Sequence, residues 1–80
     1  DLRTEAEMAL AADGRILALR LRSWGNVGAY ATGTGTAIQL MIGPWVQTSV
    51  YDIRVVDFHF RSVLTNTMPV GAYRGAGRPE

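Results

Sequence analysis

The chain has 80 residues, no cysteine and a formal net charge of +1, and arginine supplies all eight of its basic residues. A chain of this length forms at most one small domain, and the absence of cysteine excludes disulfides and Cys-ligated metals. Because acidic and basic residues are interleaved and no apolar run reaches about 18 residues, we expect no nucleic-acid partner and no membrane span.

Residues 1–24 are predicted to form an antiparallel β-hairpin. Small or apolar side chains alternate with charged ones over residues 2–10, and a second alternating run covers residues 16–24. This period of two is typical of half-buried strands. Asp13-Gly14 lies between the runs and favours a tight turn. A helix over residues 5–12 is the alternative, because those residue types also favour helices.

Residues 25–50 are predicted to form a loop and one short helix. Four glycines fall within residues 25–35, a composition typical of a loop. The apolar segment 36–42 follows as a short helix, which we expect Gly43-Pro44 to end.

Residues 51–65 are predicted to form a long strand, with Val56, Phe58 and Phe60 facing one way and the neighbouring charged side chains facing the other. Residues 66–80 then form a loop. The predicted fold class is therefore α+β: an antiparallel hairpin, a further long strand and one short helix.

Three glycines and two arginines fall within the last ten residues, which makes this segment a candidate site loop. Glycine permits positive φ, so the amides of Gly75 and Gly77 can face an oxygen-rich group. Arg74 and Arg78 supply planar, permanently charged forks for such a group. A solvated turn at the chain end is the alternative.

Other residues offer weaker signals. His59 is the sole histidine and lacks the partners of a catalytic triad or zinc site, so we interpret it as an exposed strand residue. Glu5 and Glu7 project from one strand face, where a solvated pair is favoured over a general acid/base pair. The run 32–36 lacks the Lys-Ser/Thr ending of a phosphate-binding loop. We therefore assign no catalytic residue and no metal ligand.

The string Thr-Asn-Thr-Met-Pro-Val-Gly-Ala-Tyr-Arg-Gly-Ala-Gly-Arg-Pro-Glu over residues 65–80 resembles the molybdenum hydroxylases, the xanthine dehydrogenase and aldehyde oxidase family. The resemblance is to their molybdopterin-binding large subunit, in which a Thr-Asn, Pro, aromatic-Arg-Gly-x-Gly segment crosses the cofactor pocket. It continues more weakly through residues 13–19 and 26–30. It implies that residues 1–80 are an internal fragment of a larger molybdopterin-binding domain.

The resemblance assigns Tyr73, Arg74, Gly75 and Gly77 to cofactor binding. Arg74 would contact the molybdenum centre or its pterin, where donors in a dry pocket are worth more than in water. Tyr73 would pack behind the loop and fix its orientation, and the glycines would allow close approach.

The resemblance also assigns two positions to substrate binding. Ala76 stands where xanthine-oxidising relatives carry a phenylalanine that stacks on the substrate, and Ile42 falls near the position of an arginine that contacts purines. Both differences argue against a purine substrate. Gly75 stands where carbon monoxide dehydrogenases have a copper-bridging cysteine, which disfavours that activity.

As implied by the family, the parent enzyme would oxidise an aldehyde or N-heterocycle with water as the oxygen source. Its cofactor would be molybdopterin in a dinucleotide form, with iron–sulfur clusters and FAD on other domains or subunits, in the cytoplasm. The family's general base is a glutamate far downstream, so Glu80 is not that residue and residues 1–80 should be inactive alone. The alternative is a non-enzymatic, self-associating β-sheet module with a vestigial loop.

Overall fold

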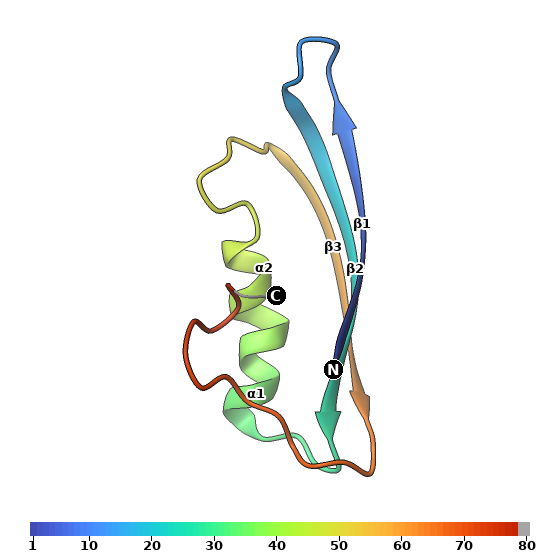
Figure 1. Ribbon diagram of the computed structural model, residues 1–80, viewed down its shortest axis with the longest axis vertical. Coiled ribbons are helices and arrows are strands. Elements are labelled where there is room, and N and C mark those ends of the chain that lie inside the picture. The colour runs from blue at the N-terminus through green and yellow to red at the C-terminus, as the bar shows by residue number, and fades with distance from the viewer. Residues whose placement is uncertain (79–80) are drawn as a thin grey trace.

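The computed structural model describes residues 1–78. It contains a three-stranded sheet in the order β1-β2-β3, with one interrupted helix and the C-terminal segment lying beside the sheet (Figure 1). The α+β class predicted from the sequence is confirmed. The strands are β1 (Leu2–Leu10), β2 (Ile16–Gly28) and β3 (Val55–Leu64); the helical turns are α1 (Gly33–Ala37), the π-helical η1 (Ile38–Ile42) and α2 (Gly43–Val46).

The predicted hairpin is confirmed: β1 pairs antiparallel with β2, and Glu5 lies opposite Arg22. Its turn uses Gly14 at φ 87°, a conformation that glycine adopts without strain. The Arg15 backbone and side chain donate hydrogen bonds to the Asp13 carboxylate, which holds the pKa of that carboxyl below its usual value of 3.8. Strand β2 runs to Gly28, four residues beyond the predicted end at Trp24.

Strand β3 pairs with β2 in parallel, from Ala18 opposite Val55 to Gly28 opposite Leu64. A parallel pair needs a long crossover connection, and residues 29–54 supply it with the helix inside. The sequence predicted this strand without its partner or direction.

The predicted loop and helix boundaries in residues 25–50 were wrong in two respects. Gly25 lies inside β2, while Gly33 and Gly35 lie inside α1, so more than half of the expected loop over residues 25–35 is regular structure. Gly43-Pro44 does not end the helix, which continues to Val46. The π-helical turn η1 leads directly into α2, so Pro44, at the first positions of α2, lies inside a continuous helical stretch.

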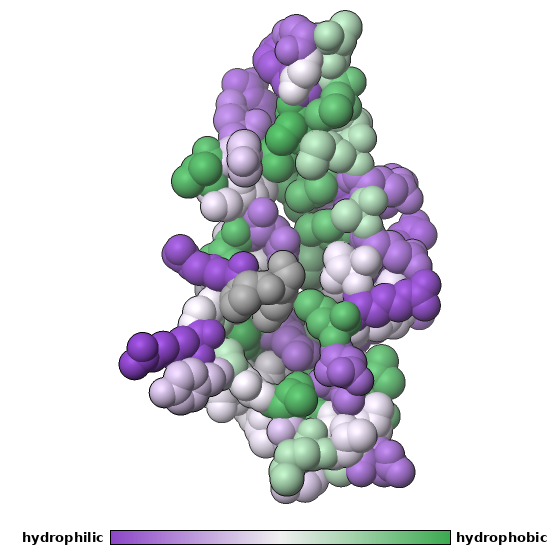
Figure 2. Space-filling view, viewed as in Figure 1, coloured by the Kyte–Doolittle hydropathy of each residue, from purple (hydrophilic) through white to green (hydrophobic). Residues whose placement is uncertain are grey.

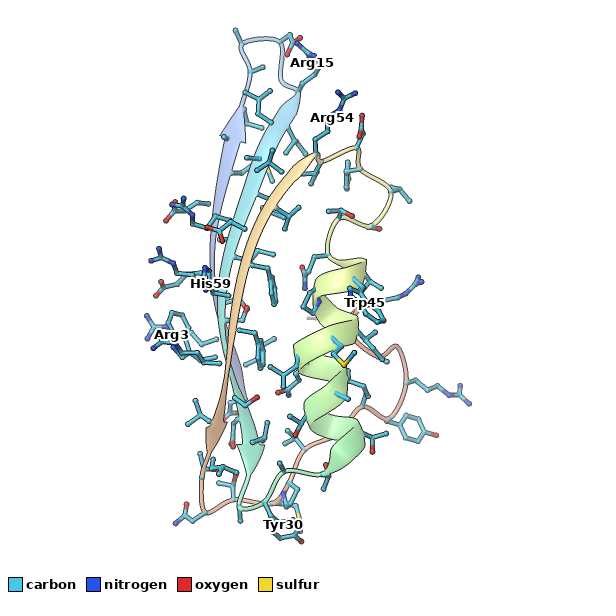
Figure 3. All side chains as sticks on the ribbon, turned by 180° about the vertical axis from the view of Figure 1, so that it is seen from behind. Arg3, Arg15, Tyr30, Trp45, Arg54 and His59 are labelled. Atoms are coloured by element: carbon cyan, nitrogen blue, oxygen red, sulfur yellow. The ribbon has the colours of Figure 1, made fainter. Side chains whose placement is uncertain are left out.

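The two faces of the sheet differ in chemistry. Arg3 and His59 project from the face turned away from the helix (Figure 3), where Arg20 also contacts Glu7 at 3.3 Å and Asp57 at 2.9 Å. On the other face, the Phe58 and Phe60 rings stack with centroids 6.4 Å apart. The alternation predicted for β3 is therefore confirmed.

The buried core is small. Among residues 1–78 the only buried apolar side chains are Leu21 and Val27. Apolar surface remains over the upper part of the sheet beyond the helix, as Figure 2 shows. Met8 and Leu10 of β1 are 53% and 59% exposed. None of the helices in residues 1–78 has the length and apolar character that crossing a membrane requires.

Candidate functional site

A polar network fixes the chain where β3 leads into the C-terminal segment. The Asn26 carboxamide accepts hydrogen bonds from Thr65 Oγ1 and the Gly28 amide, each at 2.8 Å, and donates to Thr67 Oγ1 at 3.1 Å. Backbone hydrogen bonds join Thr65 to Gly28 and Ala29 to Thr67, each at 2.9 Å. The two threonines of the C-terminal motif therefore anchor the segment to the end of β2. The sequence did not assign this role to Asn26.

Three glycines bring the C-terminal backbone against β2 and the helix. A Cβ on Gly28 would lie 2.5 Å from Pro69 Cα, and one on Gly35 would collide with the Val70 carbonyl oxygen. A Cβ on Gly77 would lie 2.8 Å from the Gly43 amide nitrogen. The segment is thus tied down on both sides of Arg74, and the residues between Val70 and Gly77 form the candidate site loop.

A cavity of about 250 Å³ lies between this loop, the helix and the start of β1. Arg74, Ala76 and Gly77 line it, whereas Tyr73 and Gly75, which the resemblance also assigned to cofactor binding, do not. Ile42 does not line it, although the Ile42 carbonyl carbon lies 3.0 Å from the position of a Cβ on Gly77. The remaining lining residues come from three elements and the loop: Asp1, Leu2, Gly35, Ile38, Gln39, Val70, Gly71 and Ala72.

Tyr73 does not pack behind the loop, and that expectation was wrong. Its side chain is 93% exposed, because the loop curves away from the helix between its two attachments. The Arg74 guanidinium lies 5.7 Å from the centre of the Tyr73 ring, a cation–π distance. Arg74 forms no ion pair within residues 1–78, so its charge is open to an anionic group.

Gly75 and Gly77 both adopt positive φ, at 84° and 79°. The Arg78 amide donates to the Gly75 carbonyl at 3.0 Å, which closes a tight turn with Gly77 at its third position. Gly77 was expected to be glycine so that a ligand could approach its backbone. The space that its missing Cβ leaves is instead filled by the helix backbone at Gly43. That the two amides face an anionic ligand stays a prediction.

Gln39 was not singled out from the sequence. Its carboxamide lies over Gly25 of β2, where any Cβ would collide with the amide oxygen and with the Phe60 ring. Gln39 Oε1 is buried and has no hydrogen-bond partner within residues 1–78, and the same holds for Thr36 Oγ1. An unpaired buried polar atom costs about 1–3 kcal/mol. A glycine inside β2 was the available signal, since it marks a close approach.

The charged face of the sheet carries a second hollow, of about 520 Å³, lined by Arg3, Trp24 and five other residues. His59 is exposed on this face, as the sequence predicted, and its Nε2 lies 3.2 Å from Asp57 Oδ1. Glu5 and Glu7 are both exposed on this face and contact Arg3 at 2.7 Å and Arg20 at 3.3 Å, so they are solvated as expected. Within residues 1–78, no three His, Cys, Asp or Glu side chains gather as a metal site would require.

The whole chain, residues 1–80, matches the family model of the molybdopterin cofactor-binding domain. The chain belongs to this family. It is 35% identical over 79 residues to the gamma subunit of the 6-hydroxypseudooxynicotine dehydrogenase complex of Paenarthrobacter nicotinovorans. That alignment covers 92% of this chain and 9% of the relative, so the chain spans about a tenth of the relative's length. No solved structure matches the chain.

Membership of the molybdopterin cofactor-binding domain family confirms the cofactor class that the C-terminal motif implied. The C-terminal motif, where the resemblance is strongest, also supplies the loop that borders the cavity. The donor set fits an oxygen-rich cofactor, since Arg74 supplies a cation that forms no ion pair within residues 1–78, although Asp1 also lines the cavity.

Proposed function

We propose that residues 1–80 are part of the molybdopterin-binding large subunit of a molybdenum hydroxylase of the xanthine dehydrogenase and aldehyde oxidase type. The parent would oxidise an aldehyde or an N-heterocycle with water as the oxygen source. The gamma subunit of a dehydrogenase complex, 35% identical, supports an oxidoreductase role. Iron–sulfur and flavin domains or subunits would be its partners, and the cytoplasm its location.

In this proposal Arg74 contacts the cofactor, together with Tyr73, Gly75 and Gly77. The observation that carries it is the loop held on both sides, at Val70 and Gly77, with a guanidinium between that has no ion pair within residues 1–78. When bound, the cofactor would supply the redox chemistry. The chain's own contribution would be the positive charge and the hydrogen-bond donors of Arg74 toward the cofactor's oxygens.

Ala76 and Ile42 would border the substrate. Ala76 lines the same cavity as Arg74, and its small side chain supplies no aromatic wall there. The Ile42 backbone packs against Gly77 from the helix side, so Ile42 lies at the back of the same loop. Neither side chain carries a charge that would select a charged substrate.

The experiment is to measure molybdenum in the purified full-length parent by mass spectrometry, for the natural protein and for Arg74→Ala and Arg74→Lys. We expect Arg74→Ala to reduce bound molybdenum several-fold and Arg74→Lys to restore it only in part, because lysine lacks the planar fork. Arg54→Ala is the matched control, since Arg54 is exposed far from the loop. A parent without molybdenum, or an Arg74→Ala variant with full molybdenum, would contradict the proposal.

A second candidate function applies to the chain in isolation: a self-associating β-sheet module. The observation that favours it is the outer edge of β1, which pairs with no other strand of the three-stranded sheet and carries no buried residue. Exposed edges favour pairing with another copy. Sizing chromatography of the isolated chain tests it, and elution as a monomer at high concentration would contradict it.

A further inference from the structure

We propose that the sheet face turned away from the helix is a docking surface for a carboxylate-rich segment of a separate polypeptide chain. The surface is centred on Arg22, Trp24 and Arg61, and we call it the arginine face. It lies on the other side of the sheet from the candidate site loop, so the inference goes beyond the proposed function and does not depend on it.

The pairing register brings the side chains of the arginine face together. Residues two apart on a strand project to the same side of a sheet, so two adjacent rows of the register share one face. In the order β1, β2, β3, these rows are Arg3, Trp24 and Arg61, and Glu5, Arg22 and His59. Figure 3 shows Arg3 and His59 pointing away from the helix. The six side chains line the hollow of about 520 Å³ on the charged face.

The positive charge of the arginine face is not balanced within residues 1–78. Three arginines and one glutamate line the hollow, so its formal charge is +2 with histidine neutral. That glutamate, Glu5, is already in contact with Arg3 at 2.7 Å. The two carboxylates of the next row along the strands are contacted by Arg20. Arg22 and Arg61 are exposed and form no ion pair within residues 1–78.

The residue types on this face are those that bind protein partners most strongly. The Arg3 guanidinium lies 5.5 Å from the centre of the half-buried Trp24 ring, a cation–π contact that holds both side chains in place. Tryptophan and arginine are enriched among the residues that dominate binding energy at protein interfaces. An arginine fork pairs with a carboxylate through two parallel hydrogen bonds. The complementary segment therefore carries carboxylates for Arg22 and Arg61 and an apolar group for Trp24.

The pairing of the strands indicates that this face is covered. Strands β2 and β3 are parallel, and parallel strands are normally covered on both faces, whereas within residues 1–78 the helix covers one (Figure 1). Enclosing unpaired arginines inside a single fold carries a large desolvation cost. Interfaces between chains are instead enriched in arginine and aromatic side chains. A separate chain that brings its own carboxylates is therefore the cover that fits this face.

The first measurement is arginine modification by phenylglyoxal in the full-length parent, purified with its associated chains and followed by mass spectrometry of its peptides. We expect Arg22 and Arg61 to react about fivefold more slowly at about 50 mM salt than at about 1 M, because salt screens the ion pairs to the docked segment. Arg54, whose side chain is 85% exposed, is the matched control and should react equally fast at both. Full reactivity of Arg22 and Arg61 at low salt, or equal protection at both, would overturn the inference.

The second measurement identifies the docked segment. A photo-cross-linker is placed by His59→p-benzoylphenylalanine, since the His59 side chain is 71% exposed in the hollow, and cross-linked peptides of the purified parent are sequenced. We expect a peptide of a separate chain that is rich in Asp and Glu. Combining Arg22→Ala with Arg61→Ala should reduce this cross-link about tenfold or more. Arg15→Ala with Arg54→Ala, outside the hollow, is the matched control and should leave it unchanged.

A cross-link to a second copy of the chain, to another segment of the parent's own polypeptide or to a segment without carboxylates would overturn the inference. So would the lack of any cross-link from position 59, or a cross-link that the double arginine variant retains in full. None of these outcomes bears on molybdenum binding by the parent, so a failure here and a failure of the proposed function are distinguishable.

Discussion

At the scale of single residues, the glycines of the C-terminal motif serve packing as much as ligand approach. Gly77 has φ 79° and lies against the backbone of Gly43, so two separate constraints require glycine there. Gly71, six residues before, has open space at the Cβ position and no positive φ. The motif therefore fixes the loop's position on the helix before any cofactor binds.

We predict that Gly77→Ala displaces the loop and reduces bound molybdenum in the full-length parent, while Gly71→Ala does not. The strain of a non-glycine residue at positive φ costs about 1–3 kcal/mol, and the contact with Gly43 adds to it. Molybdenum content and the thermal unfolding midpoint are the two measurements. Equal molybdenum in both variants would show that the contact of Gly77 with the helix does not position the loop.

The sequence predicted those site residues that belong to a local motif and missed those whose contacts are with residues distant in the chain. Arg74, Ala76 and Gly77 were assigned through a local motif, and the cavity does bring them together. Gln39 and Asn26 were missed because their partners, Gly25 and Thr65, are distant in the sequence. The predicted packing of Tyr73 behind the loop was wrong. The exposure of its side chain depends on how the loop curves, and the local sequence pattern does not determine that curvature.

At the scale of elements, the strands were predictable and the helix boundaries were not. Alternation with period two marked all three strands, because each has one charged and one apolar face. The helical stretch contains residues that usually disfavour helices: Gly33 and Gly35 lie in α1, and Gly43-Pro44 begins α2 without ending the stretch. Close backbone packing with residues 69–77 overrode local propensity there. The parallel pairing of β3 depended on that crossover, so it could not be predicted either.

The contact between the helix and the sheet gives an element-scale prediction. We expect Gly25→Ala to separate η1 from β2, because the added Cβ meets Gln39 and the Phe60 ring; overpacking of this kind costs about 1–3 kcal/mol. Gly33→Ala is the matched control: it adds a methyl to α1 in open space and should be neutral or stabilise by up to about 0.5 kcal/mol.

Hydrogen exchange of the full-length parent, followed by mass spectrometry, measures this effect locally. Peptides from η1 and the adjoining part of β2 should exchange faster in Gly25→Ala than in the natural protein, and peptides from the hairpin turn should not. Unchanged protection over η1 in Gly25→Ala would show that the sheet adapts to the larger side chain.

At the scale of the whole molecule, the chain is more extended than an independent domain of its size. Its radius of gyration is 14.1 Å, whereas about 11.6 Å is typical of 80 residues. Its accessible surface is 5960 Å², against about 4,700 Å² for a compact protein of the same mass. Folded in this way, residues 1–78 leave much of their apolar side-chain surface exposed, Met8 and Leu10 among it.

We therefore predict that the isolated chain is marginally stable and associates through the edge and apolar face of β1. Met8 and Leu10 lie on that face and are more than half exposed. Charged side chains on an edge strand oppose pairing, so Met8→Lys with Leu10→Lys should shift the chain toward monomer. Analytical ultracentrifugation at about 10–100 µM measures the shift. Arg3→Lys is the control, since it keeps the charge on the opposite face. Association that is equally strong in the double variant would place the contact on another surface of the molecule.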